Sequence, residues 1–201
     1  MPLTTLDPKT ALVVVDLQKG ILSLPTAHPS GSVVEKAGQL ARAFRKKGLP
    51  VVLVNVAGGA PGRTDAGPRN FTPPHDWLEI VSALDPQASD IRVTKKQWGA
   101  FYGTALDLEL RRRGITQIVL AGIATSIGVE STARDAYERG YNVTLVVDAM
   151  TDMRPEAHEN SLTSIFPRLG ETGNTVELLA LLESSAERSG STPAASYCLR
   201  V

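Results

Sequence analysis

Short apolar runs alternate with helix-like segments along the chain, and this alternation most constrains the fold. The run 11–15 has the length and composition of a buried parallel strand, and 51–56, 91–94, 118–121 and 143–147 are the next four predicted strands. Residues 169–171 are a short sixth candidate. Helical spacing of apolar residues appears over 33–47, 104–113, 127–139, 155–166 and 175–184. Strands that alternate with helices predict parallel βαβ units and therefore an α/β fold.

The composition fits one folded domain. The chain has 201 residues and is 42% hydrophobic, with no internal repeat and no shift in composition. We expect a domain over residues 1–185 and a Ser- and Ala-rich tail over 186–201. Lys plus Arg equals Asp plus Glu, at 21 each. A neutral chain lacks the basic field that non-specific binding to nucleic acid or to an acidic membrane requires.

Cysteine usage and the first residues predict the compartment. Cys198 is the single cysteine, so an intramolecular disulfide cannot form. The chain starts without a basic stretch followed by an apolar one, and no apolar run approaches about 20 residues. We therefore expect a cytoplasmic protein.

Asp16 directly follows the first strand, within Val-Val-Val-Asp-Leu-Gln. Ligands bind beyond the carboxyl ends of parallel strands, so this carboxylate is placed for chemistry. Partial desolvation there raises the pKa of a carboxyl group and suits it to proton transfer. The alternative is a helix cap or a turn former, which are common roles of Asp.

Two lysines, Lys95 and Lys96, follow the third strand. A lysine beside Asp16 would bind a substrate anion and lower the carboxyl pKa by charge pairing. The alternative is that both lysines are solvated, as adjacent lysines usually are.

Five further residues are candidates for the pocket. Trp98, Phe101 and Tyr102 lie just after the lysine pair and could form its wall, or serve in core or interface packing. Gln18 lies next to the aspartate, and Thr125 lies in the turn after the fourth strand.

That turn runs from the fourth strand into a helix and contains Gly128. Backbone N–H groups at a helix start bind anions, and glycine allows close approach. The alternative is an ordinary strand–turn–helix with Thr125 or Ser126 as its N-cap. The long loop 57–74, rich in Gly and Pro, has the length of a functional lid or a partner contact.

No cofactor or metal is indicated. His28, His75 and His158 are scattered without metal-ligand spacing, and we interpret each as a surface residue. Neither a Gly-x-Gly-x-x-Gly fingerprint nor a phosphate loop is present, and Gly-x-Ser-x-Gly is also missing.

Three segments together resemble the isochorismatase-like hydrolase superfamily. They are Val-Val-Asp-Leu-Gln at 14–18, Lys-Lys-Gln-Trp-Gly-Ala-Phe at 95–101, and Gly-Ile-Ala-Thr-Ser-Ile-Gly-Val-Glu-Ser-Thr-Ala-Arg-Asp-Ala at 122–136. The resemblance covers residues 8–184. It implies a three-layer, doubly wound, Rossmann-like fold with a six-stranded, mostly parallel sheet and helices on both faces. It also implies a homo-oligomer, a dimer or larger.

The resemblance assigns roles to particular residues. Asp16 matches the acid/base aspartate of the family and Lys95 its lysine, while Ile123-Ala124 matches a bond that is often a cis peptide. Cysteine hydrolases of the family place their nucleophile where this chain has Gly128. The Asp-x-His metal motif of nicotinamidases, after the second strand, is replaced here by Val-Ala-Gly-Gly at 56–59.

These departures leave three hypotheses open. The first is hydrolysis of a small molecule by Asp16 and Lys95 without a covalent intermediate, on a vinyl ether such as isochorismate, since isochorismatases also have Gly at this position. The second is hydrolysis of an amide or carbamoyl amide by direct attack of water. The third is a catalytically silent family member that binds a small ligand.

Overall fold

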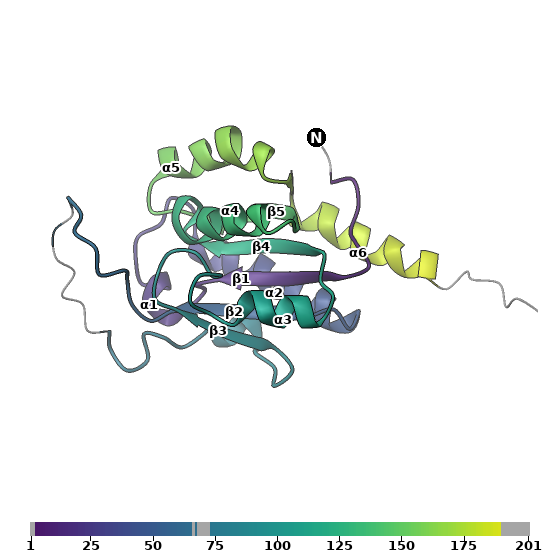
Figure 1. The fold of residues 1–201 in the computed structure, drawn as a ribbon, viewed down its shortest axis with the longest axis horizontal. Helices are drawn as coiled ribbons and strands as arrows, with labels where there is room; N and C mark the ends of the chain where they lie inside the picture. The colour runs from purple at the N-terminus through teal and green to yellow at the C-terminus, as the bar shows by residue number, and fades with distance from the viewer. Residues whose placement is uncertain (1–2, 66, 68–72, 190–201) are drawn as a thin grey trace, which may run out of the picture.

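The computed structural model describes residues 3–65, 67 and 73–189, and it is built on one parallel sheet (Figure 1). Its six strands lie in the order β3-β2-β1-β4-β5-β6, and every neighbouring pair is parallel. The strands are Thr10–Val15 (β1), Val51–Val56 (β2), Ile91–Lys95 (β3), Gln117–Ile123 (β4), Asn142–Thr151 (β5) and Glu171–Gly173 (β6). The predicted α/β fold is confirmed.

Helices cover both faces of this sheet. They are Lys19–Leu22 (α1), Ser30–Lys46 (α2), Leu106–Arg112 (α3), Glu130–Glu138 (α4), Pro155–Asn160 (α5) and Thr175–Ser189 (α6). Short 3₁₀ and π-helical segments add Ser82–Leu84 (η1), Thr125–Val129 (η2), Ser161–Ile165 (η3) and Phe166–Arg168 (η4). None of the helices in the described part of the chain is long and apolar enough to cross a bilayer.

Strand β1 supplies both halves of the core because side chains alternate along a strand. Leu12 and Val14 pack with α2 and α6 on one face, whereas Val13 and Val15 pack with α3 and α4 on the other. The carboxyl ends of the strands lie on the same side of the molecule as α1 and the segment 57–64, at the left of Figure 1.

Several expected boundaries were wrong. The sixth strand covers 171–173 instead of 169–171, and the helices expected over 127–139 and 155–166 each include a π-helical turn. Helix α6 continues to Ser189, so the expected tail begins within a helix; residues 190–201, with Cys198, lie outside the described residues.

Helix α3 turns one face to the core and the other to solvent. Leu106 and Leu110 are buried, but Leu108 is 51% exposed. A helix repeats every 3.6 residues, so positions four apart share a face and the one between them points away.

Candidate active site

Asp16 and Lys95 meet at the carboxyl ends of β1 and β3. Strand β2 lies between these two strands, and the side chains reach across its end. The Nζ of Lys95 lies 2.7 Å from Oδ2 of Asp16, and the two side chains are 1% and 6% exposed. The alternative that both lysines are solvated is therefore wrong for Lys95 and right for Lys96, which is exposed.

All three ammonium hydrogens of Lys95 have acceptors within the protein. Besides the carboxylate, the Nζ donates to the carbonyl oxygen of Trp98 at 2.7 Å and to that of Gln97 at 3.3 Å. A lysine ammonium has three donors, so none is left for a ligand. Lys95 thus orients the Asp16 carboxylate and supplies its countercharge.

Asp16 has one oxygen without a partner. Its Oδ1 is buried and forms no hydrogen bond with any described residue. Burial raises the pKa of Asp16 from 3.8 to about 6, although the charge and the hydrogen bond of Lys95 act in the opposite direction. The residue is also in the left-handed region, at φ 54°, which is uncommon outside glycine and typical of functional turns. Near neutral pH this group can both give and take a proton.

Gly128 lies directly over the ion pair. A Cβ atom at this position would lie 3.2 Å from Oδ2 of Asp16, 3.3 Å from Nζ of Lys95 and 3.1 Å from Cγ1 of Val15. These contacts are tighter than ordinary van der Waals packing. Glycine therefore lets the backbone of η2 approach the two charged groups closely.

Hydrogen bonds to Asp152 fix the turn that carries Gly128. The peptide bond between Ile123 and Ala124 is cis. The buried carboxylate of Asp152 accepts hydrogen bonds from the backbone N–H of Ser126 at 2.7 Å and from its hydroxyl at 2.8 Å. Neither Thr125 nor Ser126 caps the helix, because the N-cap is Ala124 and makes no side-chain bond.

The ion pair lies in the lining of a cavity of about 1280 Å³. The segment 58–64 of the Gly-rich loop forms part of the lining. This placement agrees with a functional role for the loop. The large apolar side chains of the lining are Ile21, Trp77, Trp98, Ile123, Ile127 and Met153.

Trp77 takes its position against a glycine of helix α1. A Cβ atom on Gly20 would lie 2.0 Å from Cδ1 and Nε1 of the Trp77 indole. The ring therefore occupies the space that any other residue at position 20 would fill. The Gly20 backbone N–H also donates to the Trp77 carbonyl oxygen at 3.1 Å.

The change Gly20→Ala is therefore expected to displace the Trp77 ring and to lower the free energy of unfolding by about 1–3 kcal/mol, as overpacking does. Urea unfolding measures the energy, and tryptophan fluorescence reports the displacement. The matched control is Gly31→Ala in α2, where nothing lies within 4 Å of the added Cβ. Ala is the better helix former, so the control should be neutral or slightly stabilising. A Gly20→Ala protein as stable as the control would contradict this packing.

Four of the expected pocket residues do not line the cavity. Gln18 is buried, and its amide bonds the backbone of Val56 and the carbonyl oxygen of Trp77. Phe101 is buried in the core, and Tyr102 is 75% exposed outside the cavity. Phe101 and Tyr102 do not follow the direction of β3, because the chain after Lys95 winds around its ammonium group.

Thr125, the fourth of these residues, faces a histidine. Its hydroxyl lies 2.8 Å from Nδ1 of His158, whose ring centroid is 4.8 Å from that of His28. His158 is buried, so the prediction that it lies on the surface was wrong. Burial, and then the neighbouring His28, lower the pKa of His158. Across residues 3–65, 67 and 73–189, no group of three or more His, Cys, Asp or Glu side chains is placed to hold a metal ion.

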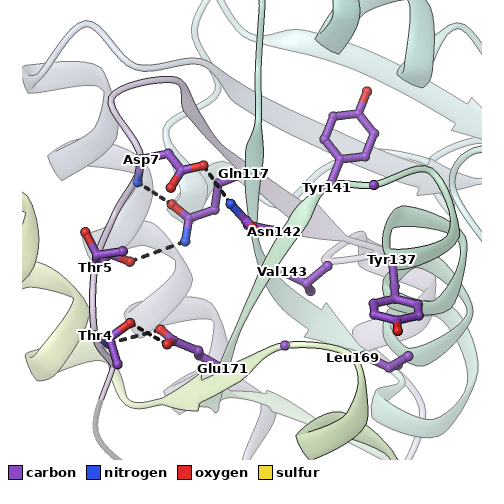
Figure 2. Close-up of a pocket in the computed structure, with 12 residues that line it drawn as sticks. Thr4, Thr5, Asp7, Gln117, Tyr137, Tyr141, Asn142, Val143, Leu169 and Glu171 are labelled. Carbon is purple, nitrogen blue, oxygen red and sulfur yellow. Dashed lines mark hydrogen bonds between the residues drawn. The ribbon is translucent and has the colours of Figure 1, made fainter.

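A second hollow, of about 480 Å³, lies at the opposite end of the sheet (Figure 2). The N-terminal segment passes the amino ends of β4 and β5 there. The Asp7 backbone N–H donates to Oε1 of Gln117, Asn142 donates to the Asp7 carboxylate, and Thr4 donates to Glu171. These polar groups satisfy one another, so the hollow is a weaker candidate than the cavity over Asp16.

Comparison with known proteins agrees with the fold and with the three sequence segments. A family model described as the isochorismatase domain matches residues 10–177. The chain belongs to the isochorismatase family. Within it, the uncharacterized isochorismatase family protein YwoC of Bacillus subtilis is 49% identical over 179 residues, which cover 85% of this chain and 93% of that protein.

Two further members of the family bear on structure and activity. The solved structure of an isochorismatase family protein from Burkholderia thailandensis has a TM-score of 0.86 and 48% identity, covering 90% of this chain and 98% of that one. The ureidoacrylate amidohydrolase RutB of Methylorubrum extorquens is 32% identical over 210 residues, covering 89% of this chain and 85% of that protein. The present isochorismatase family protein is a hydrolase.

Sequence reasoning missed several residues of the cavity. Trp77 and Met153 lie far from the recognised segments, and nothing in their local sequence marks them. Arg63 lies in the Gly-rich loop, which was recognised as functional without any residue being singled out. Asp152 binds Ser126 and does not line the cavity; it follows β5, and its position beyond a strand end was the signal that could have found it.

Proposed function

We propose that this hydrolase uses Asp16 as an acid–base group on a small molecule, without a covalent enzyme intermediate, and that its substrate is a vinyl ether of the isochorismate type. The observation that supports this is the unpartnered Oδ1 of Asp16, on a carboxyl group whose pKa is raised to about 6. Oδ2 is held by Lys95, so Oδ1 is the oxygen free to carry the proton.

The lining of the cavity supports attack by water instead of by a side chain. No thiol is present among its described residues, and Thr64 carries their only hydroxyl. At the position where cysteine hydrolases of the family have their nucleophile, this chain has Gly128, which places only backbone beside the ion pair. The covalent route through a thioester is therefore not available at this position.

The reaction then proceeds in two steps. Asp16 in its acid form gives its proton to the terminal carbon of the vinyl ether, and the adjacent carbon becomes an oxocarbenium centre. Water adds to that centre, the carbon–oxygen bond to the leaving alcohol breaks, and the excess proton returns to Asp16. Its carboxylate, paired with Lys95, stabilises the positive charge that develops between these steps.

A second candidate is hydrolysis of an amide or carbamoyl amide by direct attack of water. It is favoured by the 32% identity to a protein named as ureidoacrylate amidohydrolase. In that reaction Asp16 would act as a base and would have to be ionised at the start.

The pH dependence of kcat/KM separates the two candidates. For a general acid with a pKa of about 6, kcat/KM is expected to be constant below pH 6 and to fall about tenfold per pH unit above it. For a general base the profile is the reverse, with the fall below pH 6. Pyruvate release from isochorismate and ammonia release from ureidoacrylate, each followed between pH 4 and 9, give the two profiles. The absence of pyruvate release above the buffer rate would remove the vinyl ether proposal.

A further inference from the structure

The carboxylate of Asp152 is buried without a cation beside it. The residue is 2% exposed, and no Lys or Arg in the described ranges forms an ion pair with it. Oδ2 accepts hydrogen bonds from the backbone N–H and the hydroxyl of Ser126, and Oδ1 accepts one from the Arg154 N–H at 3.2 Å. A buried carboxylate is unfavourable unless such bonds compensate it, so its location calls for a reason beyond filling space.

The register of the sheet brings Asp152 to the turn above the ion pair. The parallel pairing of β4 and β5 shifts between Leu120 and Gly122, and it ends with Ile123 opposite Thr151. Asp152 therefore lies beside the first residue after β4, where η2 begins. Irregularities of this kind re-aim side chains and are common next to active sites.

Asp152 fills the anion site that the sequence predicted at this helix start. Ser126 is the second residue of a helical stretch that runs through η2 into α4 without a break. The first N–H groups of a helix have no partner within it and favour a negative group. Because the N–H of Ser126 donates to Asp152 at 2.7 Å, this donor is occupied by the protein itself.

The two halves of the turn are attached in different ways. After Gly128, the hydroxyl of Thr132 donates to the Gly128 carbonyl oxygen at 2.6 Å, within the same helical stretch. Before Gly128, Ser126 is bound twice by Asp152, which lies outside that stretch. The position of the first half of the turn over the ion pair therefore depends on Asp152.

We propose that Asp152 is a positioning residue for the proton transfer at Asp16: through Ser126 it holds the turn of Gly128 against the ion pair and shields that pair from water. The backbone of Gly128 is close enough for this, since a Cβ atom there would lie 3.2 Å from Oδ2 of Asp16. The kinetic consequence rests on the proposed function, whereas the shielding is measured without turnover.

The pKa of Asp16 reports the shielding directly. Burial and Lys95 set this pKa, and Asp152 is not among the groups that shift it, so a change in an Asp152 variant reports altered burial. Asp152→Asn keeps the shape of the side chain but replaces a charged acceptor by a neutral one, which binds about half as strongly. The pKa of Asp16 is expected to fall from about 6 to about 5 or lower, towards 3.8.

Carbon-13 NMR of protein labelled at the aspartate carboxyl carbons measures this pKa. The Asp16 signal is identified by its loss in Asp16→Asn and is followed from about pH 3 to about pH 8, the range that spans both values. Ser126→Ala is a milder second variant, because it removes the hydroxyl bond and leaves the N–H bond in place. It should lower the pKa of Asp16 by a smaller amount.

Asp148→Asn is the matched control. Asp148 lies in the same strand, and its Oδ1 accepts from the N–H of Thr175 at 2.8 Å and from its hydroxyl at 2.9 Å, the same pair of bonds at the start of α6. Neither residue lines the cavity. Asp148→Asn and Asp152→Asn should both lower Tm, as the loss of a helix cap does, but only the second should change the pKa of Asp16.

The expected kinetic effect is on kcat. Asp152→Asn should lower kcat about tenfold or more and leave KM within about threefold of the wild type, because the turn affects the reacting centre more than the binding of the substrate body. Asp148→Asn should leave both constants unchanged. A fall of KM and kcat that is the same in the two variants would indicate a general loss of folded protein and would contradict the positioning role.

The positioning role and the proposed function fail in different ways. An Asp16 pKa that stays within about 0.3 of the wild-type value in both Asp152→Asn and Ser126→Ala would overturn the positioning role, as would an equal shift in Asp148→Asn. A fall in the Asp16 pKa, in a protein that hydrolyses none of the proposed substrates, keeps the positioning of the turn and removes the proposed function. Hydrolysis with the wild-type kcat in Asp152→Asn keeps the reaction and removes the positioning role.

Discussion

Asp16→Asn is expected to lower kcat/KM by about 10²- to 10⁴-fold, the range that a general acid or base contributes. Asn has nearly the same shape and tolerates the left-handed backbone that this position adopts at φ 54°. It cannot exchange a proton from the position of Oδ1. The rate of hydrolysis, measured on whichever substrate proves active, is the test.

Asp85→Asn is the matched control for this change. Asp85 is the other described non-glycine residue with a positive φ, at 47°, and it is exposed and outside the cavity. The control is expected to keep the wild-type rate, and both variants should show cooperative thermal unfolding. An Asp16→Asn enzyme that keeps full activity would show that neither proposed reaction runs through this carboxyl group.

Lys95→Met is expected to give the largest loss of stability. The change removes one partner of a buried ion pair and leaves the Asp16 carboxylate without a countercharge, which typically costs about 3–5 kcal/mol. It also removes the two influences that lower the pKa of Asp16, so this pKa rises further above its unfolded value of 3.8.

The sign of the pH dependence follows from that rise. Between the unfolded and folded pKa values the folded protein binds the proton more strongly, so stability increases as the pH falls through this window. The deficit of Lys95→Met relative to the wild type should therefore be greatest above pH 8 and should shrink towards pH 4. Urea unfolding at several pH values measures this deficit. The control is Lys96→Met, which changes the neighbouring exposed lysine. A deficit that does not change with pH would mean that Lys95 stabilises the fold by packing alone.

The homo-oligomer that the family resemblance implies stays a prediction. Trp98 and Ile127 are exposed apolar side chains in the lining of the cavity, and they are the first candidates for contact with a second copy of the chain. The mass of the protein in solution decides this question.

Local sequence determined the framework of this protein. The runs that became β1, β2 and β4 are apolar over most of their length, because helices cover both faces of the sheet there, whereas the edge strand β3 alternates buried and exposed residues. Their ends then placed Asp16, Lys95 and Gly128 at one edge of the sheet, since all parallel strands point the same way. The two residues of the ion pair were predictable for this reason.

The tertiary structure decided what surrounds that pair. Three residues close in sequence to Asp16 or Lys95 do not line the cavity: Gln18, Phe101 and Tyr102. Trp77 and Arg63 have no distinctive local pattern and reach the site through a loop. The hydrophobic pattern shows where each parallel strand ends, so it also shows which residues lie just beyond the carboxyl ends of the strands. The direction of a side chain in a turn depends on contacts with distant segments, which only the folded chain brings together.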